Sequence, residues 1–133
     1  MFVWKDNLSV AKELMEIAES TNVSGLKEGF YRTAISKSYY ACLMTIKQKN
    51  IEKSIDSKIG GQDSHIAIID STLEYKNFLE KRKEINKITI TMRKLKKERT
   101  KADYQLESVY YNQEFVSRHI TTCENLLDLI NSL

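Results

Sequence analysis

The chain has 133 residues, of which 41% are hydrophobic and 29% are charged, and its formal net charge is +3. This balance is typical of one globular domain that buries a core without disulfides or metal ions, and no apolar run approaches the roughly 20 residues that span a bilayer. The N-terminal segment Met1–Asn7 has none of the features of a secretory signal. We therefore expect a soluble, cytoplasmic protein with no membrane attachment.

The sequence contains no proline and only four glycines, so little interrupts its helical patterns. An all-α fold is expected. Cys42 and Cys123 lie within apolar helical patterns and form no CxxC motif, which favours reduced core cysteines. His65 and His119 have no second ligand at a metal-binding spacing. We expect no metal and no cofactor.

Two helices are predicted in the first fifty residues. The first extends from about Asp6 to Ser20, with Asp6 or Ser9 as its cap, and the second from about Leu26 to Asn50. The buried face of the first helix is expected to hold Leu8, Ala11, Leu14, Met15 and Ala18. The apolar stripe of the second comprises Phe30, Tyr31, Ala34, Ile35, Ser38, Cys42, Leu43 and Ile46.

The rest of the chain predicts a loop and three further helices. The loop covers Ile51 to Asp63 and contains Gly60-Gly61, after which Ser64 caps a shorter third helix. The expected apolar positions of that helix are Ile66, Ile69, Leu73 and Phe78. A fourth helix is predicted from about Lys81 to Arg99 and a fifth from Asn112 or Gln113 to Ser132, the latter with Phe115, Val116, Ile120, Cys123, Leu126, Leu127 and Ile130 on its apolar face. These elements predict an up-and-down bundle of four to five helices in one domain, residues 1–133.

The segment from Lys81 to Lys101 holds ten basic residues and two acidic ones, a net charge of +8. A local positive field of this size attracts polyanions, of which nucleic acid is the commonest. The candidate RNA-binding lysines are Lys94, Lys96, Lys97 and Lys101. The alternative is that these lysines form only a solubilising helix face.

Arg99 continues the apolar seam of the fourth helix. Ile85, Ile88, Met92 and Leu95 recur at steps of three and four residues, and the next step reaches Arg99. A guanidinium at such a position faces the interior or a partner helix, where it is costly without a counter-charge. We expect a carboxylate or a phosphate close to it.

Two segments carry a recognisable pattern. The first reads R-x-A-x-S-x-x-Y-Y-A from Arg32 to Ala41, and the second reads R-x-K-A-D-Y from Arg99 to Tyr104. With the order of the helices, they resemble the two signature stretches of the HEPN superfamily over about Leu8 to Ile130. The chain has no glycine-rich phosphate loop and no GxSxG motif, so the common hydrolase patterns give no competing assignment.

The resemblance implies an all-α bundle that forms a homodimer, with the arginine motifs meeting at the interface. Many members are metal-independent ribonucleases of toxin–antitoxin, abortive-infection or CRISPR systems that use an R-x4-6-H motif. Its arginine holds the scissile phosphate, and its histidine helps to move the proton of the attacking 2′-hydroxyl. Here Tyr104 stands at the x4 spacing, no histidine follows, and a tyrosine is a poor base near neutral pH. The candidate catalytic residues are Arg99, Asp103 and Tyr104, and Arg32 joins the lysines as an RNA-binding candidate.

Other interpretations stay open at this stage. The chain is either RNA-directed or a catalytically inactive adaptor that binds a nucleotidyltransferase or another defence protein, in which case Tyr104 is a candidate for modification. A third hypothesis is that the chain is an unrelated bundle that binds a ligand between its helices. In purely structural terms, Arg99 and Asp103 form an ion pair at the i, i+4 spacing, and Arg32 pairs with Asp103 or Glu107. Tyr39 and Tyr40 are then core aromatics whose hydroxyls reach polar partners.

Overall fold

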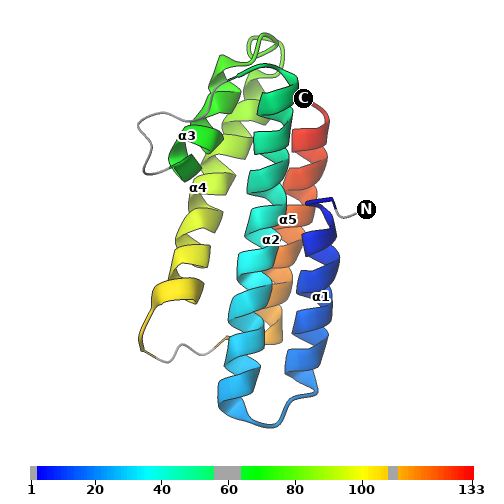
Figure 1. The fold of residues 1–133 in the computed structure, drawn as a ribbon, viewed down its shortest axis with the longest axis vertical. Coiled ribbons are helices and arrows are strands. Elements are labelled where there is room, and N and C mark those ends of the chain that lie inside the picture. Colours follow the sequence, from blue (N-terminus) through cyan, green and yellow to red (C-terminus); the bar gives the residue numbers. More distant parts are fainter. Residues whose placement is uncertain (1–2, 56–63, 108–110) are drawn as a thin grey trace.

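The computed structural model describes residues 3–55, 64–107 and 111–133 of the chain, and these form an all-α bundle (Figure 1). The elements are α1 (Asp6–Glu19), α2 (Ser24–Glu52), α3 (Ser64–Asp70), the 3-10 turn η1 (Ser71–Glu74), α4 (Arg82–Tyr104) and α5 (Gln113–Asn131). No strand occurs in these ranges, which confirms the predicted fold class. Within the same ranges, none of the helices is long and apolar enough to cross a membrane.

The four long helices run alternately up and down, and α3 with η1 packs beside the upper end of α4 (Figure 1). The central helix is α2, which packs against α1, α4 and α5. Helices α1 and α4 lie on opposite sides of α2 and α5 (Figure 1). The larger core cluster joins α2, α4 and α5 around Leu43, Met92 and Leu127, and a second cluster lies around Ala11, Ile35 and Val116.

The predicted apolar faces of α1, α2, α4 and α5 are the faces that the bundle buries. The short helix differs, because the chain tightens into a 3-10 turn at Ser71. A 3-10 turn advances by about 120° per residue instead of 100°, so it rotates later side chains off the buried face. The prediction that Leu73 is buried is therefore wrong, since it is 41% exposed. Phe78 lies beyond the helix and is half-buried.

The ends of the helices also depart from expectation. The cap position of α1 is Lys5, whose side chain makes no capping bond, so the predicted caps Asp6 and Ser9 are wrong. Asp6 instead opens the helix and accepts a hydrogen bond from the backbone N–H of Val3 at 3.1 Å. Helix α4 continues past Arg99 to Tyr104. Helix α2 runs on to Glu52, so the predicted loop from Ile51 to Asp63 begins too early, and residues 56–63 of that loop lie outside the described residues.

A buried polar network fastens the end of α2 to the 3-10 turn. The Tyr75 hydroxyl donates to Oδ1 of Asn50 at 2.6 Å, and Nδ2 of Asn50 donates to the Ser71 hydroxyl at 2.7 Å. Asn50 is 1% exposed. Burial, with the nearby charge of Glu52, raises the pKa of Tyr75 to about 12, so its hydroxyl stays a donor near neutral pH.

The variant Asn50→Ala is expected to lower the free energy of unfolding by about 2 kcal/mol, because it leaves two buried hydroxyls without their partner. Urea unfolding followed by circular dichroism measures this. The matched control is Gln48→Ala on the exposed side of α2, which should change stability by less than about 0.5 kcal/mol. Equal effects of the two variants would show that the network adds nothing.

Candidate functional site

Arg99 lies on the buried face of α4, as the seam predicts. It lies one turn after Leu95 on this face and is only 6% exposed. Nη1 donates to Oδ2 of Asp103, one turn later, at 3.1 Å. Nε is buried and has no hydrogen-bond partner. The expected carboxylate is thus present, but it leaves at least one buried donor of the guanidinium unused.

Three tyrosine rings surround this guanidinium. Cζ of Arg99 lies 5.4 Å from the ring centroid of Tyr39, 5.5 Å from that of Tyr40 and 5.8 Å from that of Tyr104. A cation at these distances is attracted by the faces of aromatic rings. Burial by itself lowers the pKa of Arg99, but the hydrogen bond to Asp103 and the neighbouring tyrosine oxygens outweigh burial and raise it. The group is a fixed cation.

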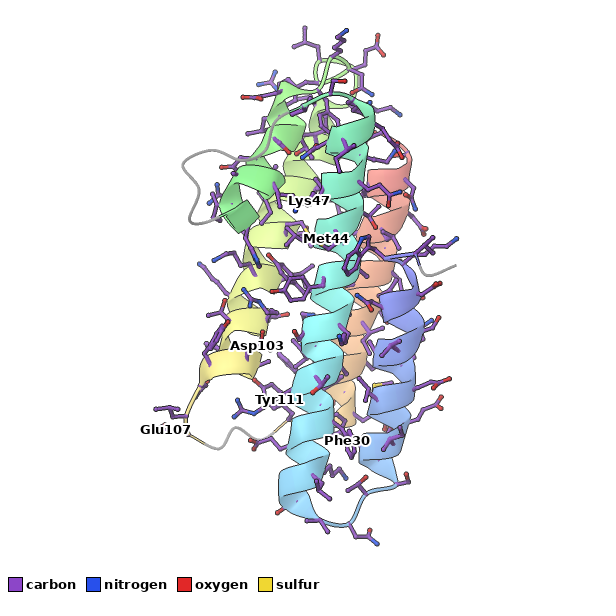
Figure 2. All side chains as sticks on the ribbon, in the orientation of Figure 1. Phe30, Met44, Lys47, Asp103, Glu107 and Tyr111 are labelled. Atoms are coloured by element: carbon purple, nitrogen blue, oxygen red, sulfur yellow. The ribbon has the colours of Figure 1, made fainter. Side chains whose placement is uncertain are left out.

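Asp103 joins the two sequence motifs. It lies on the side of α4 that faces α2 (Figure 2), where its Oδ2 accepts from Arg99 and from the Ser36 hydroxyl at 3.4 Å. The two signature segments, far apart in the sequence, therefore meet at one place. We define the Arg99 cluster as Ser36, Tyr39, Tyr40, His65, Arg99, Asp103 and Tyr104.

His65 enters this cluster from α3. Its ring lies 5.8 Å from that of Tyr39 in a stacked arrangement and 5.7 Å from that of Tyr40, edge to face. Its Nδ1 is 3.1 Å from the Tyr39 hydroxyl. Sequence reasoning gave this histidine no special weight. The sequence places this histidine at the start of the third helix, but that position becomes informative only once α3 is placed against α2.

Arg32 binds the C-terminal end of α4. Nη1 donates to the carbonyl oxygens of Ala102 at 3.0 Å and Gln105 at 3.1 Å, and Nη2 donates to that of Glu107 at 3.1 Å. Nε pairs with the Glu28 carboxylate at 3.0 Å. Arg32 therefore caps α4 through backbone carbonyls. Its contact with Glu107 is a hydrogen bond to the main chain of Glu107, whereas the carboxylate that it pairs with is that of Glu28. Its RNA-binding role stays a prediction.

The predicted lysines do not share one face with Arg99. At about 100° of rotation per residue, Lys94, Lys97 and Lys101 point away from the side of α4 that holds Arg99. All three are exposed. Lys96 is half-buried. Viewed down the helix axis, Asp103, then Lys96, then Tyr104 lie at increasing angles from Arg99. An anion held at Arg99 therefore meets Lys96 first.

His119 is a structural ion-pair partner. Its Nδ1 lies 2.7 Å from Oε1 of Glu98, and its Nε2 lies 3.1 Å from the carbonyl oxygen of Ile35. Both partners only accept hydrogen bonds, so both ring nitrogens carry protons. Burial lowers the pKa of His119, but the hydrogen bonds and charges of Cys123 and Glu98 outweigh burial and raise it to about 9. Burial likewise raises the pKa of Glu98, and its hydrogen bond to His119 brings the net value below the ordinary one.

The two cysteines lie in the core without a disulfide bond. Cys42 and Cys123 are both buried, and Sγ of Cys42 donates to the carbonyl oxygen of Cys123 at 3.2 Å. In the part of the chain that the structure describes, no three His, Cys, Asp or Glu side chains are placed to hold a metal ion. The Arg99 cluster offers cation, hydroxyl and imidazole chemistry, suited to binding an anion and moving a proton.

No protein-family model, no curated protein and no solved structure matches the chain.

Proposed function

We propose that this chain is a HEPN-type RNA-binding protein of a prokaryotic defence or toxin–antitoxin system, and that it acts in the cytoplasm as a homodimer. The observation that carries the proposal is Arg99, an arginine 6% exposed whose Nε has no partner. A buried donor without a partner is rare and destabilising in a folded core. An RNA phosphate supplies the missing acceptors, and a guanidinium suits it because its donors match the geometry of phosphate oxygens.

The surroundings of Arg99 favour RNA over a small inorganic anion. Tyr104 is 69% exposed and its ring lies beside the guanidinium, so an unpaired base can stack on it while the adjoining phosphate binds Arg99. The ion pair with Asp103 neutralises one charge of the site. Long-range attraction therefore comes from the lysines of α4, of which the half-buried Lys96 lies nearest to Arg99 around the helix.

The test is binding of a fluorescently labelled single-stranded RNA, measured by fluorescence anisotropy in EDTA at several salt concentrations. The unaltered protein is expected to bind, with an affinity that falls as salt rises. Arg99→Met should weaken binding at least about tenfold, because it removes a charge-assisted phosphate contact of roughly 1.5 to 3 kcal/mol. Methionine keeps much of the buried side-chain volume, so the core is filled in both proteins.

The matched control is Arg82→Met, which removes the same charge from the exposed first residue of the same helix. It lies about 25 Å from Arg99 along the axis, since a helix rises about 1.5 Å per residue. We expect this variant to weaken binding less than about threefold through the general field alone. Equal losses in the two variants, or no binding at low salt, would remove the RNA-binding proposal.

A second candidate function is a catalytically inactive adaptor that docks a nucleotidyltransferase or another defence protein. The observation that favours it is a set of exposed apolar side chains on and just after α4: Ile90 is 70% exposed, Tyr104 69% and Leu106 102%. Apolar groups this exposed are common at protein interfaces. Under this function, co-purification with a protein encoded next to the chain replaces RNA binding as the expected result. A mass shift on the peptide that contains Tyr104 would then identify it as a modified residue.

A further inference from the structure

The only tryptophan of the chain lies beside α2, in a groove that the N-terminal segment helps to form. Trp4 borders two adjoining hollows: one of about 520 Å³ that extends over Met44, Lys47 and Ile51, and one of about 290 Å³ that extends over Lys49. We define the Trp4 groove as these two hollows. Trp4 is 36% exposed and Ile51 is 71% exposed, so the groove presents an aromatic ring and apolar surface to solvent.

The charge of the Trp4 groove is positive. Lys5, Lys47 and Lys49 line it, and Glu52 is the one carboxylate among the described residues around it. No described residue forms an ion pair with any of these three lysines. An aromatic ring beside such ammonium groups is the combination by which proteins hold single-stranded nucleic acid, because a base stacks on the ring while the phosphates bind the cations.

One strip of α2 connects the Trp4 groove with the Arg99 cluster. Tyr40, Met44, Lys47 and Ile51 recur at steps of four, three and four residues, so they lie on one side of the helix. None of the four is buried, and Met44 and Lys47 are labelled on α2 in Figure 2. The Tyr40 ring lies 5.5 Å from Cζ of Arg99. The strip therefore begins at the guanidinium and ends in the groove.

The length of this strip suits a short strand of RNA. Tyr40 and Ile51 are about 17 Å apart along the axis, since a helix rises about 1.5 Å per residue. Successive phosphates of a stacked strand are about 3.4 Å apart, so about five nucleotides cover the strip.

We propose that the Trp4 groove is a second base-stacking site for the RNA strand that binds at Arg99, and that Lys47 holds a phosphate between the two sites. This inference rests on the proposed RNA-binding function and specifies its ligand as a single strand of at least about five nucleotides. A duplex is excluded as the ligand, because its bases are paired and stacked on one another and cannot stack on Trp4 or Tyr104.

The emission of Trp4 tests the inference without a label on the protein. With excitation beyond the absorption of tyrosine, an unlabelled single strand of about ten nucleotides should quench this emission at the concentrations at which anisotropy shows binding. In Arg99→Met, the quenching should move to at least about tenfold higher RNA concentration, because one strand occupies both sites. Quenching at unchanged concentrations in that variant, or binding without quenching in the unaltered protein, overturns the inference.

Variants of the groove provide the second measurement. Trp4→Ala should weaken binding of the same strand at least about fivefold, whereas Trp4→Phe keeps a ring and should weaken it less than about twofold. Lys47→Gln should reduce the slope of log affinity against log salt by about 0.7, the share of one phosphate contact on a single strand. The matched control is Lys27→Gln, about 30 Å away on the same helix, which should leave the slope unchanged.

The groove and the proposed function fail in different ways. If RNA binds but neither Trp4→Ala nor Lys47→Gln has its expected effect, the inference is overturned and the RNA-binding proposal stands. A duplex of the same length that binds as tightly as the single strand also overturns it. Absence of binding by the unaltered protein defeats the proposed function itself. If Trp4→Ala does not fold, judged by its circular dichroism, the quenching of Trp4 and the salt slope of Lys47→Gln decide.

Discussion

The free energy of unfolding is expected to fall by up to about 3 kcal/mol as the pH rises from about 6 to about 9.5, because His119 loses the proton of its buried ion pair with Glu98. The pKa of Cys123, which Cys42 and His119 lower to about 6, offsets part of this fall. The pKa of His119 is about 9 in the folded chain, above its ordinary value of 6.5. A raised pKa means that the stabilisation is fully present below pH 6.5 and is lost as the pH rises through about 9. Urea unfolding at a series of pH values measures the change.

Acid weakens the same pair for the opposite reason. The pKa of Glu98 lies below its ordinary value of 4.5, so its contribution is present above that value and is lost as the pH falls through the folded pKa. We therefore expect the pair to stabilise the fold most between about pH 5 and pH 6.5.

Two variants separate His119 from other groups that titrate in the same range. His119→Gln cannot ionise, so its stability should change little between about pH 6 and pH 9.5. Cys123→Ala removes the thiol near the ring but leaves Glu98 in place, so the fall in stability should keep its direction. An undiminished fall in His119→Gln would assign the pH dependence to another residue.

Asp103→Ala is expected to lower the free energy of unfolding by about 2 kcal/mol, because it leaves a buried guanidinium without its counter-charge. Arg99 is 6% exposed and donates to Asp103 at 3.1 Å, whereas Asp103 is itself exposed, so water reaches the place of the lost carboxylate and the loss is smaller than for a fully buried pair. Arg99→Met, by contrast, should change stability by less than about 1 kcal/mol, since it removes the charge that needs the partner and keeps an apolar side chain on the seam. The measurement is urea unfolding near pH 6.

The double variant Arg99→Met with Asp103→Ala provides the control. In the absence of the guanidinium, removal of Asp103 should cost less than about 0.5 kcal/mol, and the difference between the two backgrounds is the coupling energy of the pair. The same full loss of about 2 kcal/mol from Asp103→Ala in both backgrounds would show that Asp103 stabilises the fold through Ser36 or the helix end instead of through Arg99. A large loss in Arg99→Met alone would identify Arg99 as a structural brace.

The sequence predicted the bundle well because its signal is local. Apolar residues at three- and four-residue steps specify which helix faces are buried, and the scarcity of helix-breaking residues lets these patterns run uninterrupted. The same argument placed Arg99 on the buried seam of α4, where the structure has it. Asn112 also behaves as its position suggests, since its side chain accepts from the N–H of Phe115 and caps α5.

The features that could not be predicted depend on contacts between distant segments. Helix α4 continues to Tyr104 because Arg32, some seventy residues earlier, supplies donors to carbonyl oxygens at its end. His65 joins the Arg99 cluster only because α3 packs where its ring can reach Tyr39. Neither arrangement leaves a periodicity or a local motif that could be recognised in the sequence.

The placement of α1 has a practical consequence. This helix packs against α2 and α5 on the side of the bundle opposite α4 (Figure 1), so its outer surface lies far from the Arg99 cluster. Ser9 is exposed on that surface. A dye or an immobilisation tag attached there would leave the cluster accessible, and would allow its ligands to be screened on intact protein without labelling the ligands themselves.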